Sequence, residues 1–93
     1  MKPRRIAIIG FGAIGSDLAV ALLERGKELY RLGILLDPAS TSRDRVPAGC
    51  KLLSSIEELR EFQPHLVVEA AGHAAVRTHV PACLGLGFSV VIT

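Results

Sequence analysis

The stretch IAIIGFGAIGSDLAVALL, residues 6–23, decides the fold of this chain. The run of apolar and mostly β-branched residues that ends at position 9 is typical of a strand buried on both faces of a sheet. Gly10, Gly12 and Gly15 interrupt it with G-x-G-x-x-G spacing. Alone, this motif fits either a turn that cradles a dinucleotide or a glycine-rich turn without a ligand. The elements around it must decide between the two.

Apolar runs and helical patterns alternate along the rest of the chain. Strands are predicted at residues 4–9, 29–36, 50–53, 66–70 and 88–93, helices at 13–25, 56–62 and 74–86, and a loop at 39–49. Short strands that alternate with helices imply right-handed crossovers and a parallel sheet covered on both faces. We therefore predict an α/β fold, a doubly wound parallel sheet of the Rossmann type with strand order 3-2-1-4-5, in which the sequence ends within the fifth strand.

Composition restricts the class of protein. With 93 residues, 49% of them apolar, residues 1–93 are expected to form one domain with a buried core. Basic residues exceed acidic ones by only two and are scattered, so nucleic-acid binding is not indicated. No apolar stretch approaches the ~20 residues that cross a membrane, and we expect a cytoplasmic protein. Cys50 and Cys83 are expected to be reduced and mostly buried.

The strand-to-helix context favours the dinucleotide interpretation of the glycine motif. In that interpretation Gly10 forms the tight turn, Gly12 lets the backbone approach a pyrophosphate, and Gly15 lets the helix pack on the strand. The amides of Gly12, Ala13 and Ile14 then face the phosphates at the positive end of the helix dipole. We predict this loop as the phosphate seat of the domain.

Asp37 ends the second predicted strand, 22 residues after Gly15. A carboxylate there can accept hydrogen bonds from the adenosine ribose, which favours NAD over NADP. Arg43 and Arg45 follow closely and could accommodate a 2′-phosphate, so NADP use stays open. The alternatives are that Asp37 only forms the turn before Pro38 and that the arginines belong to a solvated loop.

The fourth predicted strand ends in EAAGH, residues 69–73, at the crevice that a dinucleotide would cross. Ala71 and Gly72 are predicted to contact the pyrophosphate or the nicotinamide ribose. For His73 we keep two roles open, a cap of the next helix and a lining residue of the pocket. Glu69 is interpreted either as a ribose or nicotinamide contact or as the partner of a polar group elsewhere in a longer protein.

No catalytic or metal site is predicted in this sequence. His79 and Cys83 share a helix face, but His73 does not join them and no fourth ligand is near, which argues against zinc. A nucleophile elbow of the G-x-S-x-G type is absent from the sequence, and Cys50 falls in a predicted strand. The residues therefore specify cofactor binding without a general acid or base.

These motifs resemble a known family. The segments IAIIGFGAIGSDLAVAL, LLD and LVVEAAGHAAVRTHVPACLGLGFSVVIT are similar to the N-terminal domain of bacterial L-aspartate dehydrogenases, whose cofactor domain also resembles that of homoserine dehydrogenase. The glycine core is shared with many dehydrogenases, whereas residues 66–93 are more discriminating. The resemblance covers essentially the whole chain.

The resemblance implies an enzyme that oxidises L-aspartate with NAD or NADP to iminoaspartate, which yields oxaloacetate and ammonia or enters NAD biosynthesis. It also implies a following substrate domain that carries the catalytic groups and that this sequence does not contain. Two alternatives stay open: the cofactor domain of a homoserine dehydrogenase-like oxidoreductase, and a non-enzymatic NAD(H)-binding module. A strand at the edge of the sheet would allow pairing with a second copy, as in a homo-oligomer.

Overall fold

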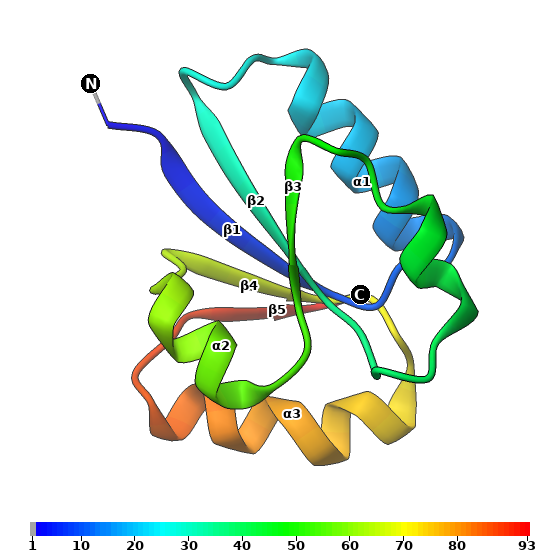
Figure 1. The fold of residues 1–93 in the computed structure, drawn as a ribbon. Helices are drawn as coiled ribbons and strands as arrows, with labels where there is room; N and C mark the ends of the chain where they lie inside the picture. The colour runs from blue at the N-terminus through cyan, green and yellow to red at the C-terminus, as the bar shows by residue number, and fades with distance from the viewer. Residues whose placement is uncertain (1) are drawn as a thin grey trace.

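The glycine motif joins two elements that form the centre of the domain. The computed structural model describes residues 2–93, except for the side chains of 73–77. Its strands are β1 (Arg4–Ile9), β2 (Tyr30–Leu35), β3 (Cys50–Leu53), β4 (Leu66–Glu69) and β5 (Val90–Ile92). Its helices are α1 (Ala13–Glu24), α2 (Ile56–Phe62) and α3 (His73–Gly85), with a 3-10 turn η1 (Thr41–Arg45) (Figure 1).

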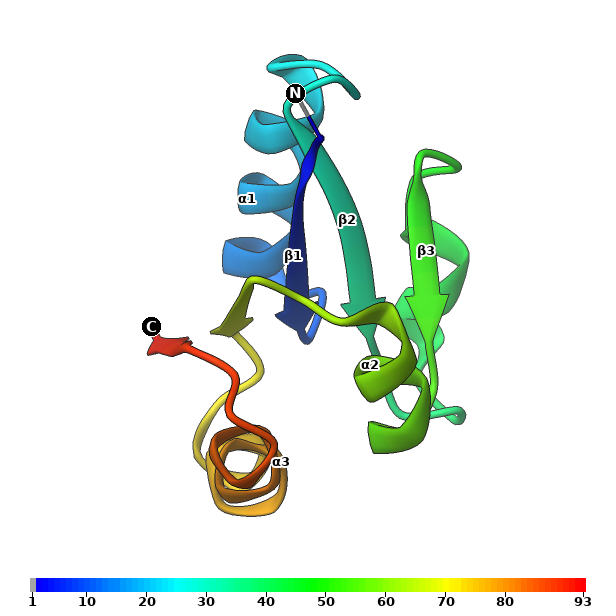
Figure 2. The same cartoon turned by 90° about the vertical axis from the view of Figure 1, so that its left-hand side faces the viewer.

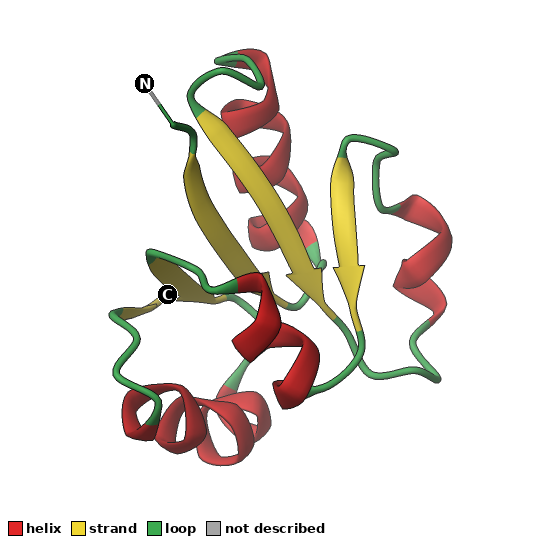
Figure 3. Ribbon diagram, turned by 60° about the vertical axis from the view of Figure 1, so that its left-hand side comes forward, coloured by secondary structure: helices red, strands yellow, loops and turns green. Residues whose placement is uncertain are grey.

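The strands form one parallel sheet in the order β3-β2-β1-β4-β5, which confirms the predicted α/β class and strand order. The central strand β1 pairs with β2 on one side and β4 on the other, so that Ile8 lies opposite both Ile34 and Val68. Since all strands run in the same direction, the turns after β1, β2 and β4 lie at the same end of the sheet, where the strands have their carboxyl ends (Figure 3).

Alternation along the strands divides the core into two layers. Ile6 and Ile8 of β1 pack under α1, whereas Ala7 and Ile9 pack in the cluster that includes Leu59 of α2 and Cys83 of α3. The views of Figures 1 and 2 place α1 on one face of the sheet and α2 and α3 on the other. This two-sided burial is the reason that the strands read as continuous apolar runs.

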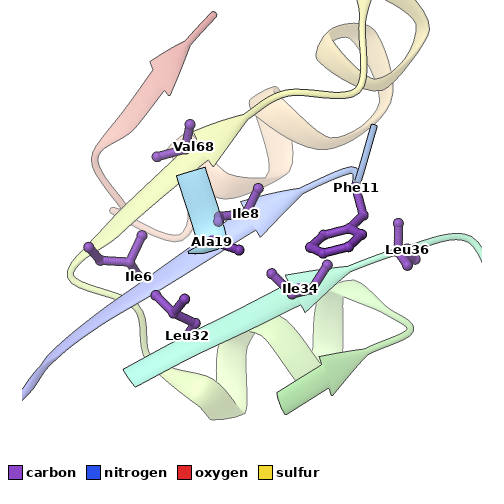
Figure 4. Close-up of a cluster of buried hydrophobic side chains, with 8 residues drawn as sticks. All are labelled: Ile6, Ile8, Phe11, Ala19, Leu32, Ile34, Leu36 and Val68. Carbon is purple, nitrogen blue, oxygen red and sulfur yellow. The ribbon is translucent and has the colours of Figure 1, made fainter. Parts of the chain in front are cut away.

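The side chain of Phe11 anchors the glycine-rich turn in the core. Phe11, which stands between the first two glycines of the motif, is only 4% exposed. Its ring lies over β2 beside Ile34 and Leu36 (Figure 4). Burial of one aromatic side chain in this position therefore fixes a loop whose next three residues are exposed.

Some boundaries differ from the sequence prediction. The expected loop at residues 39–49 contains η1, because the Ser40 side chain accepts a hydrogen bond from the amide of Ser42 and starts a turn. Helix α3 begins at His73, one residue early, and includes Pro81 within its length. Strand β5 is shorter than expected at both ends. Among the described residues, no helix is both long enough and apolar enough to span a bilayer.

Candidate functional site

The turn from β1 to α1 is held in a conformation that needs glycine at two positions. Gly10 has a φ of +95°, and a Cβ on it would lie 2.6 Å from the Cβ of Ala71. A Cβ on Gly15 would lie 2.6 Å from the carbonyl oxygen of Gly10. The turn after β1 is thus pressed against the turn after β4 on one side and against α1 on the other, as the predicted roles of Gly10 and Gly15 require.

Gly12 differs from both of these glycines. A Cβ at Gly12 would meet no atom within 4 Å, and its φ of −77° suits any residue. Helix α1 begins directly after Gly12, with no side-chain cap and no acidic residue in its first turn among the described residues. The exposed amide end of α1 therefore carries the uncompensated positive end of a 12-residue helix.

The turn from β4 to α3 has the opposite character, because its amides are already paired. Glu69 is 1% exposed, and its Oε1 accepts hydrogen bonds from the amides of Ala71, at 2.5 Å, and Gly72, at 3.0 Å. The amide of Ala70 donates to the Ile9 carbonyl at 2.9 Å and ties this turn to β1. A ligand beside Ala71 and Gly72 would thus meet their carbon atoms rather than free amides.

Glu69 is the residue whose role the sequence interpretation missed. We expected either a contact with the cofactor or a partner elsewhere in a longer protein, whereas its carboxylate turns back onto the two amides that follow. The physical reason is that a buried carboxylate needs donors, and the amides of a tight turn are the nearest ones. A lone acidic residue directly before a small-residue turn was the available signal.

Asp37 lies just after β2 and is exposed. Its Oδ1 accepts a hydrogen bond from the amide of Ala39 at 2.8 Å, which forms the turn that the sequence left as the alternative role. No hydrogen bond engages its Oδ2 among the described residues. The side chain can therefore hold the turn with one oxygen and offer the other to a ligand.

The guanidinium groups of the two arginines after β2 both form hydrogen bonds within the protein. Arg43 Nη1 donates to the Ser54 hydroxyl at 3.3 Å. Arg45 Nη2 donates to the Ser42 hydroxyl at 2.9 Å and to the carbonyl of Phe11 at 3.4 Å. The second of these contacts brings a guanidinium to the glycine-rich loop, so that Arg45 belongs to the surroundings of the site rather than to a separate solvated loop.

A cavity of about 470 Å³ opens at the carboxyl ends of β1 and β2, where the turn after β4 adjoins them. It is lined by Ile9, Gly10, Leu35, Leu36, Asp37, Ser40, Ala71, Thr78 and His79. Its volume is within the usual range of ligand pockets, and its position is the one where open α/β sheets bind ligands. Three predicted site residues, Gly10, Asp37 and Ala71, thus line one cavity.

The other predicted positions lie outside this lining. Gly12, Ala13 and Ile14 are exposed at the start of α1, and Gly72 is exposed at the start of α3. The side chain of His73, for which two roles were predicted, lies outside the described residues. Conversely, the sequence did not suggest Thr78 and His79 as lining residues, because their position depends on how α3 packs across the sheet.

A larger cavity, of about 630 Å³, lies at the amino ends of β1, β2 and β3. Its lining includes the basic side chains of Arg5, Lys27, Arg31 and Lys51 together with Glu61. Neither of the two turns that approach each other at Gly10 and Ala71 contributes to it. Size alone would select this cavity, but the smaller cavity lies at the carboxyl ends of the strands, where open α/β sheets bind ligands.

Neither the described histidines and cysteines nor the described carboxylates form a metal-binding group. No three of these side chains come together among the described residues. Cys83 is buried and Cys50 is half-buried, and burial raises the pKa of both thiols. Both are therefore protonated at neutral pH, which makes them poor nucleophiles and poor metal ligands.

Comparison with known proteins agrees with this geometry. Residues 10–93 match the family described as homoserine dehydrogenase, NAD binding domain. The chain is 38% identical over 88 residues to L-aspartate dehydrogenase 2 of Bordetella pertussis, and 39% identical over 89 residues to L-aspartate dehydrogenase of Brucella anthropi. Each alignment covers 95% of this chain and 33% of the relative, so the chain spans about a third of the length of these curated relatives.

A solved structure has the same fold. UDP-D-quinovosamine 4-dehydrogenase from Vibrio fischeri superposes with a TM-score of 0.67 and covers 97% of this chain and 77% of its own. Its sequence identity is 19%, so this likeness concerns the fold alone.

Proposed function

The chain belongs to the family of homoserine dehydrogenase NAD-binding domains, and on that premise we propose that it is the cofactor-binding part of an L-aspartate dehydrogenase. The observation that supports the proposed binding mode best is Gly12, which leaves open space in front of the uncapped end of α1. An anionic group is stabilised there by free amides and by the helix dipole. The sequence similarity to L-aspartate dehydrogenases supports the choice of aspartate over homoserine.

In this proposal each described residue of the site has one task toward the dinucleotide. The amides at Gly12, Ala13 and Ile14 bind the pyrophosphate, while Gly10 and Gly15 allow the turn to pack closely enough to present them. Ala71 and Gly72 form the wall beside the phosphates. A dinucleotide bound by these residues would supply a nicotinamide as hydride acceptor. This chain orients the ring, and the groups that bind substrate belong to the rest of the longer enzyme.

We propose NAD as the preferred cofactor, with NADP as the alternative. The unpaired Oδ2 of Asp37 can accept hydrogen bonds from the ribose hydroxyls and would repel a 2′-phosphate. Nη2 of Arg45 is engaged by the Phe11 carbonyl and the Ser42 hydroxyl, so a 2′-phosphate would have to bind the remaining nitrogens of the guanidinium. The arrangement of the two side chains therefore favours the unphosphorylated ribose.

Titration of the purified chain with NADH tests the binding proposal. Fluorescence of the reduced nicotinamide or calorimetry should detect saturable binding, and the Gly12→Asp variant should weaken it strongly because its carboxylate faces the phosphates. The control is Gly85→Asp, which places a carboxylate at an exposed glycine with equally open surroundings, at the C-terminal end of α3. Lack of binding to the wild type at millimolar NADH and NADPH would overturn the proposal.

Substrate choice requires the part of the enzyme that binds substrate. A fusion of this chain to the remaining two thirds of the Brucella anthropi enzyme should form reduced cofactor with L-aspartate. The same fusion with Gly12→Asp is the control for cofactor binding by this chain. Turnover of homoserine without turnover of aspartate by the natural full-length protein would favour the homoserine dehydrogenase alternative.

A further inference from the structure

The amino ends of β1, β2 and β3 carry a row of basic side chains on one face of the sheet. Arg5 lies directly opposite Arg31 in the parallel register, and Lys51 lies opposite Gly33, two residues further along β2. Residues two positions apart in a strand share a face, so all three basic side chains lie on the face where Ala7 packs with α2 and α3. Three adjacent strands thus place positive charges side by side.

The described helices leave this row uncovered. Helix α2 has only 7 residues, and the amino ends of β2 and β3 extend past it (Figures 1 and 2). The cavity of about 630 Å³ lies here, and Lys27, which lies between α1 and β2, adds a fourth basic side chain to its lining. Glu61 is the one carboxylate in that lining among the described residues. Four basic side chains and one acidic side chain give the cavity a net charge of +3.

These charges are largely unpaired within the protein. Among the described residues, the side chains of Lys27, Arg31 and Lys51 form neither a salt bridge nor a hydrogen bond. Arg5 is held in place by its Nε, which donates to the Gln63 carbonyl at 2.6 Å. Like charges on neighbouring strands repel one another. Unpaired like charges that line one cavity generate a positive field there, and that field attracts anions.

The cavity favours a small anion over a protein partner. Its volume is within the range of small-molecule pockets. None of the large apolar side chains exposed among the described residues lines it, whereas protein interfaces have an apolar centre. The forked guanidinium groups of Arg5 and Arg31 match the geometry of phosphate oxygens, and the lysine ammonium groups add point charges. A net charge of +3 suits a ligand with more than one phosphate group.

We propose that this cavity is a second anion site, which binds a small ligand that carries a chain of phosphate groups. The inference goes beyond the proposed cofactor function and does not depend on it. The cavity lies at the amino ends of the strands, whereas the glycine-rich turn follows the carboxyl end of β1. A ligand can therefore occupy the cavity while a dinucleotide is bound at the turn.

Calorimetric titration of the purified chain with sodium tripolyphosphate tests the site. The wild type should show saturable binding, and Arg31→Gln and Lys51→Gln should each raise the Kd about fivefold, the effect of one unit charge at about 4 Å in water. The matched control is Arg4→Gln, which removes the same charge from β1 on the opposite face of the sheet, outside the cavity lining. It should change the Kd only slightly. Equal weakening by all three substitutions would overturn the inference, because attraction to the net charge of the chain would then explain the binding.

The open end of α1 is the competing position for an anion. In a ¹H–¹⁵N spectrum of the wild type, tripolyphosphate should shift the amide resonances of Arg31, Gly49 and Lys51 and leave those of residues 12–14 in place. Gly12→Asp should weaken NADH binding without changing these shifts. Shifts confined to residues 12–14, and lost in Gly12→Asp, would overturn the inference and leave the proposed cofactor function intact. Binding of tripolyphosphate at the amino ends without any binding of NADH would overturn the proposed function alone.

Unfolding by urea separates a binding role from a structural role. Arg31→Gln removes repulsion from Arg5, so its midpoint without ligand should equal or exceed that of the wild type. Tripolyphosphate should raise the midpoint of the wild type, because it binds the folded state, and should raise that of the double variant of Arg31 and Lys51 much less. A midpoint that falls in Arg31→Gln, with the ligand-induced increase retained in the double variant, would overturn the inference.

Two sources can supply a chain of phosphate groups, a nucleotide and an inorganic polyphosphate. CTP carries the chain on a base other than adenine, so it does not present the base of the proposed cofactor. Tighter binding of CTP than of tripolyphosphate would identify a nucleotide, and weaker binding would identify a free polyphosphate. Both results support the site where Arg31→Gln and Lys51→Gln weaken the two ligands alike, and CTP binding that neither substitution affects would overturn a nucleotide as its occupant.

Discussion

The two turns that meet at Gly10 and Ala71 differ in whether the backbone amides that follow the strand are paired within the protein. Both connect a buried strand to a helix, and both start their helix after a glycine. The turn after β1 leaves the end of α1 without a capping side chain, whereas the turn after β4 directs the amides of Ala71 and Gly72 onto the buried Glu69 carboxylate. Among the described residues, the first turn leaves the amide end of its helix without a side-chain partner, and the second turn pairs its amides internally.

This difference shows how a site can be both open and well ordered. Free amides are useful to an anion only if the loop that carries them is fixed, and an uncapped turn does not fix itself. Here Phe11 anchors the open turn in the core, and the closed turn supports it through the contact of Ala71 with Gly10. Glu69 thus supports the open turn after β1 through Ala71, without touching that turn itself.

Breaking the contact between the turns should have the largest effect. Gly10→Ala adds a Cβ at a φ of +95° and 2.6 Å from the Cβ of Ala71, so we expect a loss of about 2–4 kcal/mol in the free energy of unfolding. Urea unfolding measures it. The double variant with Ala71→Gly should recover only a fraction of this loss, because the new Cβ would still lie 2.8 Å from the Cα of residue 71 and the backbone conformation is unchanged. A fully stable single variant would contradict the close packing of the two turns.

Opening the closed turn should have the next largest effect. Glu69→Leu leaves the amides of Ala71 and Gly72 without their acceptor, which should cost about 2 kcal/mol of stability because one or both remain poorly solvated. Glu69→Gln keeps an acceptor oxygen and should cost less. The same unfolding measurements apply, with Glu61→Gln, on the exposed surface of α2, as the control. Equal stability of the Leu and Gln variants would show that Glu69 is not the support of this turn.

The sequence was sufficient for the parts of this comparison that depend on local patterns. β1 and β3 have the bounds predicted from the sequence, and the apolar run of β1 reflects burial of both its faces at the centre of the sheet, whereas β3 is an edge strand. The glycine spacing predicted the open turn because Gly10 and Gly15 stand where a Cβ would clash with neighbouring atoms, whereas Gly12 leaves open space. Asp37 was correctly predicted to follow β2, because the apolar run of that strand stops directly before Asp37-Pro38.

Other features depend on contacts between residues that are distant in the chain, and no local sequence pattern indicates them. Thr78 and His79 reach the cavity only because α3 packs across the sheet, which no pattern within the helix specifies. Arg45 reaches the Phe11 carbonyl because the Ser40 cap folds residues 41–45 into a turn that appeared to be an ordinary loop. Glu69 was visible as an unusual residue, but its role required knowing that the chain reverses directly after it.

Filling the open turn should affect binding and leave the fold intact. Gly12→Ala adds a methyl group that meets no protein atom within 4 Å, so stability should stay within about 0.5 kcal/mol of the wild type. The methyl group occupies the space where a pyrophosphate would approach the backbone, and NADH affinity should fall about tenfold, or about 1.4 kcal/mol. Gly85→Ala, at an equally open helical glycine, should bind NADH normally. An unchanged Kd for Gly12→Ala would place the phosphates elsewhere.

The smallest effect concerns the discrimination between the two cofactors beside the open turn. Asp37→Asn keeps the Oδ1 that accepts from the Ala39 amide, so the turn should survive while the charge is removed. The ratio of NADP to NAD affinity should then rise about fivefold, because repulsion between two exposed unit charges at about 4 Å is worth about 1 kcal/mol in water. Asp44→Asn removes a nearby exposed charge from η1 and should leave the ratio unchanged. A ratio that does not move with Asp37→Asn would restrict this residue to its turn, and discrimination between the cofactors would then fall to the arginines of η1.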